Sequence, residues 1–224
     1  MDAVLRAVPL FAELDDASWP GLAARFTRRP LARGDVVFHE GAPGDTLYVV
    51  TEGKVKIGRT ALDGRENLLA VLGPGDVFGE LSLFDDEART ATATALTDGE
   101  LAALHHTELR TFLKEWPDAA GEMLRVLARR LRQTNDAMAD LVFTDVPGRV
   151  AKTLLGLAER FGQAGSDGVR VNHDLTQEEL AQLVGASRET VNKALSDFAG
   201  RGWLRVDGRA VVLLDRDRLE RRAH

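Results

Sequence analysis

The sequence contains no cysteine among its 224 residues. Disulfides, cysteine-ligated zinc, iron–sulfur clusters and thiol nucleophiles are therefore excluded. Its apolar runs are short and interrupted by charge, so no segment approaches the roughly 20 apolar residues of a membrane-spanning helix. The first residues have neither the basic start nor the apolar stretch of a secretory signal, so we expect a cytoplasmic protein with no membrane partner.

What the chain does have is the composition of a folded protein. Hydrophobic residues make up 44% and charged residues 29%, which excludes a disordered chain. The net charge of −6 argues against a chain that coats nucleic acid with its whole surface. From Asp145 to the end, however, 13 basic residues accompany 12 acidic ones, whereas the numbers before it are 16 and 23. An acidic front part is thus joined to a nearly neutral back part.

Turn-forming residues recur every eight to twelve positions in the front part. The runs between them are rich in apolar and β-branched residues: VVFHE, TLYVVTEG, KVKIGRT, NLLAVLG, DVFGE, RTATATALT and GELAALH. Short strands at this spacing are typical of an antiparallel roll, barrel or sandwich rather than of βαβ units. Helical spacing follows from position 105, so we expect an α+β fold.

A long helix is predicted from Pro117 onward. Positions three and four residues apart along it form a heptad seam: Leu124, Leu127, Leu131, Thr134, Met138 and Leu141. The seam is compatible with packing on the chain's own roll or with a dimer. Charged residues on the opposite face, such as Arg125 and Arg132, are typical of a solvent face and favour the dimer.

The back part carries a helix-turn-helix pattern in LTQEELAQLVGASRETVNKALSDFAGRG. Thr176 followed three residues later by Glu179 is a capping box that starts a helix. Gly185 can adopt the positive φ of a tight turn, and Ser187 caps the second helix. The alternative is a plain helical hairpin with ordinary surface charges, which would not require the turn, the caps and the polar face to coincide.

Polar residues cluster at the start of the second helix, where a DNA-reading helix contacts base edges in the major groove. Arg can donate to both acceptors of guanine, Glu can accept from cytosine, and hydroxyl groups suit a phosphate. The predicted DNA-binding residues are Ser187, Arg188, Glu189, Thr190, Asn192 and Lys193. Two β-type runs around Asp207-Gly208 then predict a type I′ hairpin, which makes the unit a winged helix.

Three segments in this order resemble the cyclic AMP receptor protein family (CRP/FNR regulators), and in particular its actinobacterial branch. They are GDVFGELSLFDDEARTATATA, LARRLRQTNDAMADLVFTDVPGRVAKTLL and LTQEELAQLVGASRETVNKAL. The resemblance covers essentially the whole chain. It implies a jelly-roll-like cyclic nucleotide-binding domain (1–116), a long dimerisation helix with a hinge (117–144) and a winged helix-turn-helix domain (145–224).

The resemblance also implies a site for cyclic AMP, acting as an allosteric effector rather than as a cofactor. In the family pattern, the turn formed by Gly79, Glu80, Leu81 and Ser82 exposes N–H groups, and Glu80 holds the ribose 2′-hydroxyl. Arg89 and Thr90 bind the cyclic phosphate, which suits a guanidinium fork and a hydroxyl donor.

The same family pattern places two residues of the long helix, Thr134 and Asn135, at the adenine amine. It makes Arg130 a candidate partner for Glu80, with a solvated Arg130 as the alternative. The dimer interface would consist of Leu124, Leu127, Leu131, Met138 and Leu141.

Two departures from the family pattern bear on the ligand. Ser82 stands where many cyclic-AMP receptors have glycine, and Asp85-Asp86-Glu87 places three acids just before Arg89. Either departure would weaken or retune the affinity without changing the ligand class. The loop QAGSDG (163–168) matches the family's contact with RNA polymerase, a further candidate partner, but its residues are not diagnostic.

The predicted function is a homodimeric, cyclic-AMP-responsive transcription regulator that binds palindromic double-stranded DNA with TGTGA-like half-sites, not an enzyme. One alternative keeps the fold but senses another effector, for example through haem on His105 or His106, or acts without ligand. Another is a cupin-like metalloenzyme. Cupins require two histidines separated by one residue, whereas His105 and His106 are adjacent and would point to opposite faces of a strand.

Overall fold

The computed structural model describes residues 1–223 except 10, 12–15, 18, 62, 63, 65 and 84–86. The chain forms two compact units, one made of residues 1–59 and 70–133 and the other of residues 60–69 and 134–224. Two of the predicted acids, Asp85 and Asp86, lie outside the described residues, as does the side chain of Arg130. Among the described residues, no helix combines the length and the apolar content that crossing a bilayer requires.

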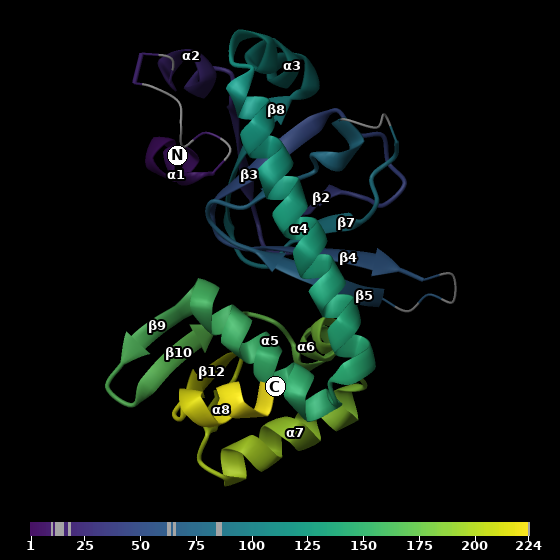
Figure 1. Cartoon of the computed structure of the whole chain (residues 1–224), viewed down its shortest axis with the longest axis vertical. Helices are drawn as coiled ribbons and strands as arrows, with labels where there is room; N and C mark the ends of the chain where they lie inside the picture. Colours follow the sequence, from purple (N-terminus) through teal and green to yellow (C-terminus); the bar gives the residue numbers. More distant parts are fainter. Residues whose placement is uncertain are drawn as a thin grey trace. The chain divides into compact units, whose positions relative to one another are not determined.

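The first unit is built on two four-stranded sheets, with strand orders β1-β8-β3-β6 and β2-β7-β4-β5 (Figure 1). The strands of these sheets are β1 (Thr27–Leu31), β2 (Val36–Phe38), β3 (Thr46–Glu52), β4 (Val55–Thr60), β5 (Glu66–Leu72), β6 (Val77–Phe78), β7 (Thr92–Ala95) and β8 (Gly99–His105). The end of β4 and the first half of β5 are grouped with the second unit. The pairings are antiparallel, as between β3 and β8 and between β4 and β7. The predicted α+β fold with an N-terminal roll is therefore confirmed.

Strand β3 separates two apolar cores because successive side chains of a strand point to opposite faces. Tyr48 and Val50 belong to the core inside the roll, together with residues of β4, β7 and β8. Leu47 and Val49 pack on the other face, against helices α1 (Asp2–Ala7), α2 (Trp19–Ala23) and α3 (His106–Glu115). Strand β3 is thus packed on both of its faces. It pairs with β6, which is followed by the single helical turn η1 (Leu81–Leu83).

The long helix α4 runs from Asp118 to Phe143, as the periodicity predicted. Several of its apolar side chains are exposed to solvent in the single chain, namely Leu124, Leu131, Met138, Leu141, Val142 and Phe143. Leu127 is half-buried. Within the described residues of the single chain, most of this apolar stripe is therefore open to solvent.

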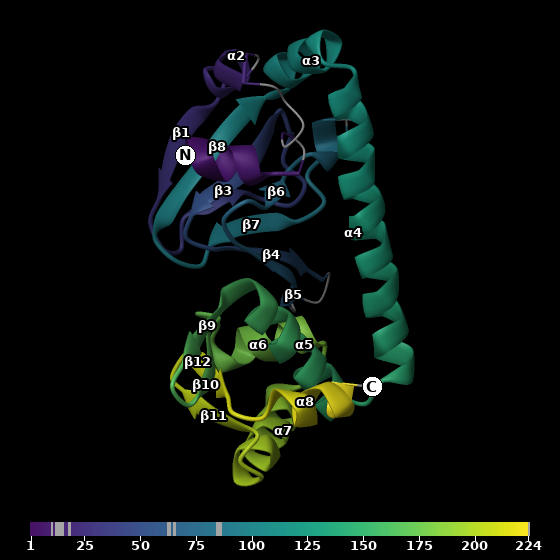
Figure 2. The ribbon, with the colours of Figure 1, turned by 60° about the vertical axis from the view of Figure 1, so that its left-hand side comes forward.

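The second unit combines four helices with a small sheet of order β11-β12-β10-β9 (Figure 2). The helices are α5 (Val146–Phe161), α6 (Gln177–Val184), α7 (Arg188–Gly200) and α8 (Arg216–Ala223), and the strands are β9 (Gly162–Gly165), β10 (Gly168–Asn172), β11 (Leu204–Asp207) and β12 (Ala210–Leu213). Helix α8 packs along α5 with Leu219 fully buried. The helix-turn-helix followed by a hairpin is the predicted winged helix.

Two details of this unit differ from the prediction. Residues 163–168 do not form a simple loop, because β9 pairs with β10 and only a short turn at Ser166 and Asp167 separates the two strands. In the wing, Asp207 pairs with Ala210, so the turn residues are Gly208 and Arg209. Only Gly208 has a positive φ (62°), so the type I′ turn predicted at Asp207-Gly208 is wrong, and glycine at the first turn position is typical of type II′.

Candidate functional site

Arg89 is held in the first unit by hydrogen bonds of its own main chain. Its N–H donates to the carbonyl oxygen of Ala42 at 2.8 Å, and its carbonyl oxygen accepts from the N–H of Gly41, also at 2.8 Å. These bonds join the segment before β7 to the turn before β3, two parts of the chain far apart in sequence. Only 5% of Arg89 is exposed, so the guanidinium is positioned inside the protein rather than on its surface.

The guanidinium of Arg89 is bound by neutral acceptors and by an aromatic ring. Nη1 donates to the carbonyl oxygen of Gly79 at 2.6 Å and to Ser82 Oγ at 3.0 Å, and Nη2 donates to the carbonyl oxygen of Thr46 at 2.7 Å. Its central carbon lies 4.3 Å from the ring centroid of Phe38. Burial lowers the pKa of Arg89, and the nearby carboxylates of Asp45 and Glu80 oppose that shift.

Two of the predicted ligand-binding residues of the roll, Gly79 and Ser82, accept hydrogen bonds from this guanidinium. The set Gly79, Glu80, Leu81, Ser82, Arg89 and Thr90 is called the cassette below. Glu80 and Ser82 are buried, at 4% and 5% exposure, whereas Leu81 and Thr90 are exposed. Gly79 has a φ of 76°, and a Cβ built on it would lie 2.7 Å from Arg89 Nη1, so only glycine leaves room for the guanidinium here. A buried cation with a buried carboxylate close by in sequence and space suits a ligand that carries both an anionic group and hydroxyl groups.

Sequence reasoning missed three residues that contact Arg89: Phe38, Gly44 and Thr46. The turn from Gly41 to Asp45 is evident in the sequence, but its contact with Arg89 joins positions more than 40 residues apart. Local patterns do not carry contacts of this range. The aromatic side chains of Phe38, Tyr48 and Phe78 also pack on one another, with ring centroids 5.3–6.0 Å apart.

The two predicted ligand residues of the long helix, Thr134 and Asn135, are both exposed on α4. They belong to the second compact unit, whereas the cassette belongs to the first. Their contact with a base therefore stays a prediction.

The histidines differ from the prediction in one respect. His105 and His106 do not point to opposite faces, because β8 ends at His105 and α3 begins at His106. Their ring centroids lie only 4.4 Å apart. Within the described part of the chain, no group of three His, Asp or Glu side chains is arranged to hold a metal ion.

The helix-turn-helix has the predicted caps. Thr176 Oγ1 accepts from the N–H of Glu179 at 3.1 Å, and Glu179 Oε2 accepts from the N–H of Thr176 at 2.7 Å, which completes the capping box. Gly185 ends α6 with a φ of 71°. Ser187 Oγ accepts from the N–H of Thr190 at 3.2 Å and thereby starts α7. The local sequence therefore specifies both helix ends at the turn.

The predicted DNA-binding residues lie on the outer face of α7. Arg188, Glu189 and Lys193 are exposed, as are Ser187 and Thr190, whereas Asn192 is half-buried. The inner face is apolar and buried, with Val191 and Leu195 in the core. The helix therefore presents its polar first turns to a partner.

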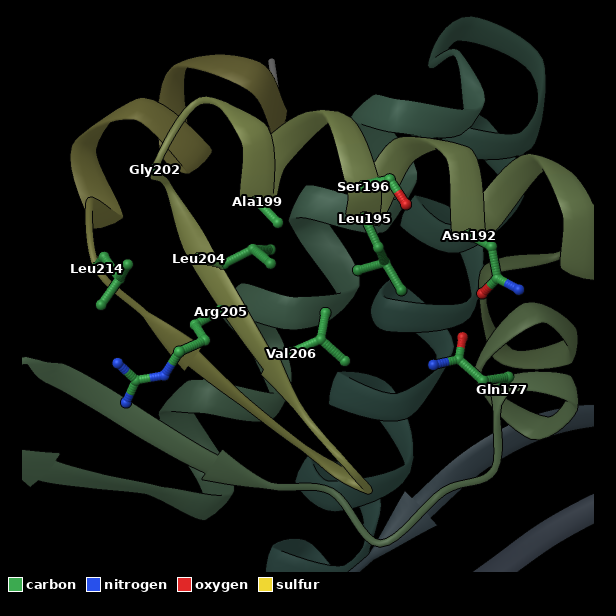
Figure 3. Close-up of a pocket in the computed structure, with 10 residues that line it drawn as sticks. All are labelled: Gln177, Asn192, Leu195, Ser196, Ala199, Gly202, Leu204, Arg205, Val206 and Leu214. Atoms are coloured by element: carbon green, nitrogen blue, oxygen red, sulfur yellow. The ribbon is translucent and has the colours of Figure 1, made fainter.

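A groove of about 800 Å³ separates α7 from the first strand of the wing (Figure 3). Its floor is mostly apolar and includes Leu195, Leu204 and Val206. Figure 3 shows the amide side chains of Gln177 and Asn192 facing each other at one end, with Arg205 toward the other. The groove begins at Asn192 and so continues from the polar face of α7.

Arg149 joins the end of α4 to the helix-turn-helix, a role that sequence reasoning did not assign. Its Nη1 donates to the carbonyl oxygen of Thr144 at 2.8 Å. Its Nε and Nη2 donate to the carbonyl oxygens of Val184 and Gly185 at 3.1 and 3.0 Å. One guanidinium thus binds three main-chain carbonyls on both sides of the predicted hinge.

Asp145 caps α5 and also pairs with α8. Its Oδ1 accepts from the N–H of Gly148 at 2.9 Å, and its Oδ2 accepts from Arg222 Nη2 at 2.5 Å. The hydrogen bond from Arg222, followed by that from Gly148, holds the pKa of Asp145 below its ordinary value. Because the folded pKa is lowered, the stabilisation is present above the ordinary carboxyl pKa and is lost as the pH falls through the folded value.

We therefore expect Asp145→Ala to lower the free energy of unfolding by about 1 kcal/mol at neutral pH, mainly through the lost cap. The largely exposed pair with Arg222 adds only a few tenths of a kcal/mol. Urea unfolding between about pH 3 and pH 7 measures the free energy of unfolding of the original chain and of the variant. The difference between the two should be constant down to about pH 4 and become smaller below it. Asp145→Ser keeps a capping oxygen and serves as the control. A difference that grows on acidification would contradict this assignment.

Comparisons with known proteins match both parts of the chain. Residues 28–115 match the cyclic nucleotide-binding domain family, and residues 148–222 match the Crp-like helix-turn-helix domain family. A CRP-like cAMP-activated global transcriptional regulator of Mycobacterium tuberculosis is 53% identical over 223 residues, covering 100% of both chains. The cyclic AMP receptor protein of Thermus thermophilus is 37% identical over 202 residues, 90% of each chain.

Among solved structures, the c-di-GMP responsive global regulator CLP of Xanthomonas campestris has a TM-score of 0.76 at 30% identity. The match covers 89% of this chain and 99% of that one. The similarity therefore extends through both compact units.

Proposed function

We propose that this chain, which belongs to the CRP family of transcription regulators, is a homodimer that takes cyclic AMP as its effector and reads a palindromic operator with α7. The relatives and both domain families are those of a DNA-binding regulator rather than of an enzyme, so the cupin-like alternative is set aside.

The observation that carries the effector assignment is the buried Arg89, which interacts electrostatically with the buried Glu80 and is closely approached by Gly44 and Gly79. A cyclic nucleotide offers one negative charge for the guanidinium and a ribose hydroxyl for the carboxylate, which is the pairing of groups that the cassette provides. Thr90 would add a hydroxyl donor to the phosphate. Thr134 and Asn135 would then contact the adenine, and the ligand would alter how the long helices pack and thereby how the DNA-binding units are held.

Dimerisation is supported by the exposed apolar stripe of α4. Leu124, Leu131, Met138 and Leu141 are each more than half exposed in the single chain. A second copy of α4 would cover them in a heptad seam. Two copies of α7 related by a two-fold axis would then enter successive major grooves, so half-sites should lie about 10–10.5 bp apart, with TGTGA-like sequences.

The test is calorimetric titration of the purified chain with cyclic AMP, cyclic GMP and cyclic di-GMP, followed by operator binding with and without each ligand. We expect cyclic AMP to bind and to raise operator affinity. Cyclic di-GMP is included because the similar Xanthomonas regulator is described as responsive to it, which makes another effector the main alternative. Operator binding that no nucleotide changes would contradict the effector assignment and leave a ligand-independent regulator.

Arg188 is expected to supply a base contact. Arg188→Ala should cost about 1–3 kcal/mol on the specific operator and relax the preference at one guanine, because the guanidinium fork to guanine is lost. Binding to single-base operator variants, at fixed salt, measures this effect. Arg201→Ala removes the same charge just after the other end of α7 and should affect operator and scrambled DNA alike. An equal loss on scrambled DNA for Arg188→Ala would show that Arg188 only contacts phosphate.

A further inference from the structure

Ser82, the cassette residue that departs from the glycine common in this family, is hydrogen-bonded to Arg89. Its Oγ accepts from Arg89 Nη1 at 3.0 Å, and each residue is only 5% exposed. Water has little access to a pair this buried, so the serine oxygen rather than solvent satisfies this guanidinium proton. The Ser82 hydroxyl therefore takes up one N–H donor of Arg89, the residue that is proposed to bind the phosphate of the ligand.

The remaining donors of Arg89 are also largely committed. A guanidinium has five N–H groups, and those of Nη1 and Nη2 already donate to Gly79, Ser82 and Thr46. Nε is buried and has no hydrogen-bond partner among the described residues. A Cβ built on Gly44 would lie 2.8 Å from Nε, so the main chain at Gly44 covers this nitrogen. A ligand oxygen that leaves Gly44 in place must reach Nη1 or Nη2, where three of four protons have protein acceptors.

Two of these three acceptors are main-chain carbonyls, and only Ser82 contributes a side chain. We propose that Ser82 competes with the anionic group of the ligand for Arg89 Nη1, and that this residue therefore sets the affinity of the cassette below the level that Arg89 alone would give. The inference depends on the proposed role of Arg89 in binding a phosphodiester.

Gly44 makes the serine possible. A Cβ built on Gly44 would lie 2.0 Å from Ser82 Oγ and 2.7 Å from Ser82 Cβ, well inside contact distance. The φ of Gly44 is not in the left-handed region, so a side chain is excluded here by space and not by backbone conformation. Gly44 and Ser82 are thus a matched pair, in which a larger residue at one position requires a smaller residue at the other.

The competition predicts tighter ligand binding when the hydroxyl is removed. Ser82→Ala should bind cyclic AMP about fivefold to tenfold more tightly than the original chain, because the ligand then supplies the acceptor that Nη1 has lost. Calorimetric titration of the full chain measures this change. Thr51→Ala removes another buried hydroxyl of the roll, one bonded to Glu100 and not to Arg89, and should leave the affinity unchanged.

Adenosine, which lacks the phosphate, separates competition from general loosening of the cassette. Its weaker binding should not change in Ser82→Ala. Unchanged or weaker cyclic AMP binding by this variant would overturn the proposal, and so would an equal gain for adenosine. Failure of the original chain to bind cyclic AMP would contradict the proposed effector instead.

The matched pair is tested without any ligand. Gly44→Ala should lower the melting temperature by on the order of 5 °C through overpacking, and adding Ser82→Gly should restore most of the loss. Adding Ser82→Ala should restore less, because the Cβ of residue 82 remains in the way. A double variant no more stable than Gly44→Ala would refute the pairing of these two residues.

Discussion

Arg89→Ala is expected to weaken cyclic AMP binding at least 100-fold. The guanidinium is the one buried cation of the cassette within the described residues, and charge-assisted hydrogen bonds contribute about 1.5–3 kcal/mol each, so losing two of them costs about 3–6 kcal/mol. Calorimetric titration measures the loss. The variant also leaves the carbonyl oxygens of Gly79 and Thr46 without this donor, so its melting temperature must be recorded beside the affinity.

Arg59→Ala is the matched control for this variant. Arg59 lies on β4 of the same roll, is exposed, and pairs with Glu40 at 2.8 Å, so its loss removes the same charge without touching the cassette. Its effect on ligand affinity should be less than about threefold, since a surface pair contributes little. A folded Arg89→Ala chain that binds within about threefold of the original would refute the assigned role of Arg89.

Leu131→Asp should convert the proposed dimer into monomers and lower operator affinity at least 100-fold. Leu131 is 62% exposed in the single chain, so an acid at this position leaves the core of the monomer intact. In a dimer the same acid would be buried in the seam opposite its own copy, where an unpaired charge is very costly. A monomer binds one half-site and loses the gain from simultaneous engagement of two. Light scattering and operator titration measure the two effects.

Arg132→Asp is the control for the seam, because Arg132 is exposed on the other face of α4. This variant should remain dimeric, and any loss of DNA affinity should be small. Dimers that persist in Leu131→Asp would mean that α4 does not form the interface, and the exposed stripe would then need another partner.

The sequence was most informative where the signal is local. The capping box at Thr176, the turn at Gly185 and the cap at Ser187 each depend on residues within four positions, and all three lie as predicted. The strands between turn residues were also predicted. Strand β1 was missed because TRRPL has little alternation and contains Pro30, which is tolerated since β1 is at the edge of its sheet.

The surroundings of Arg89 show why the remainder was not predictable from spacing alone. The family resemblance named Arg89 but not the carbonyl oxygen of Thr46 or the ring of Phe38, which lie 43 and 51 positions away in the chain. The predicted wing turn lies one residue before the observed one. Both Asp207-Gly208 and Gly208-Arg209 contain the glycine by which a two-residue hairpin turn is predicted from sequence. Only the pairing of β11 with β12 selects between them.

The three hydrogen bonds of Arg149 bear on how this regulator can be recombined with others. Because the guanidinium binds Thr144 as well as Val184 and Gly185, the last turn of α4 and the DNA-reading helices are joined by one side chain. The acceptor at position 144 is a main-chain carbonyl, so a chimaera that exchanges the residues after Asp145 keeps it whatever side chain stands there. The segment that is brought in must instead carry an arginine at the position of Arg149, since this side chain donates to all three carbonyls.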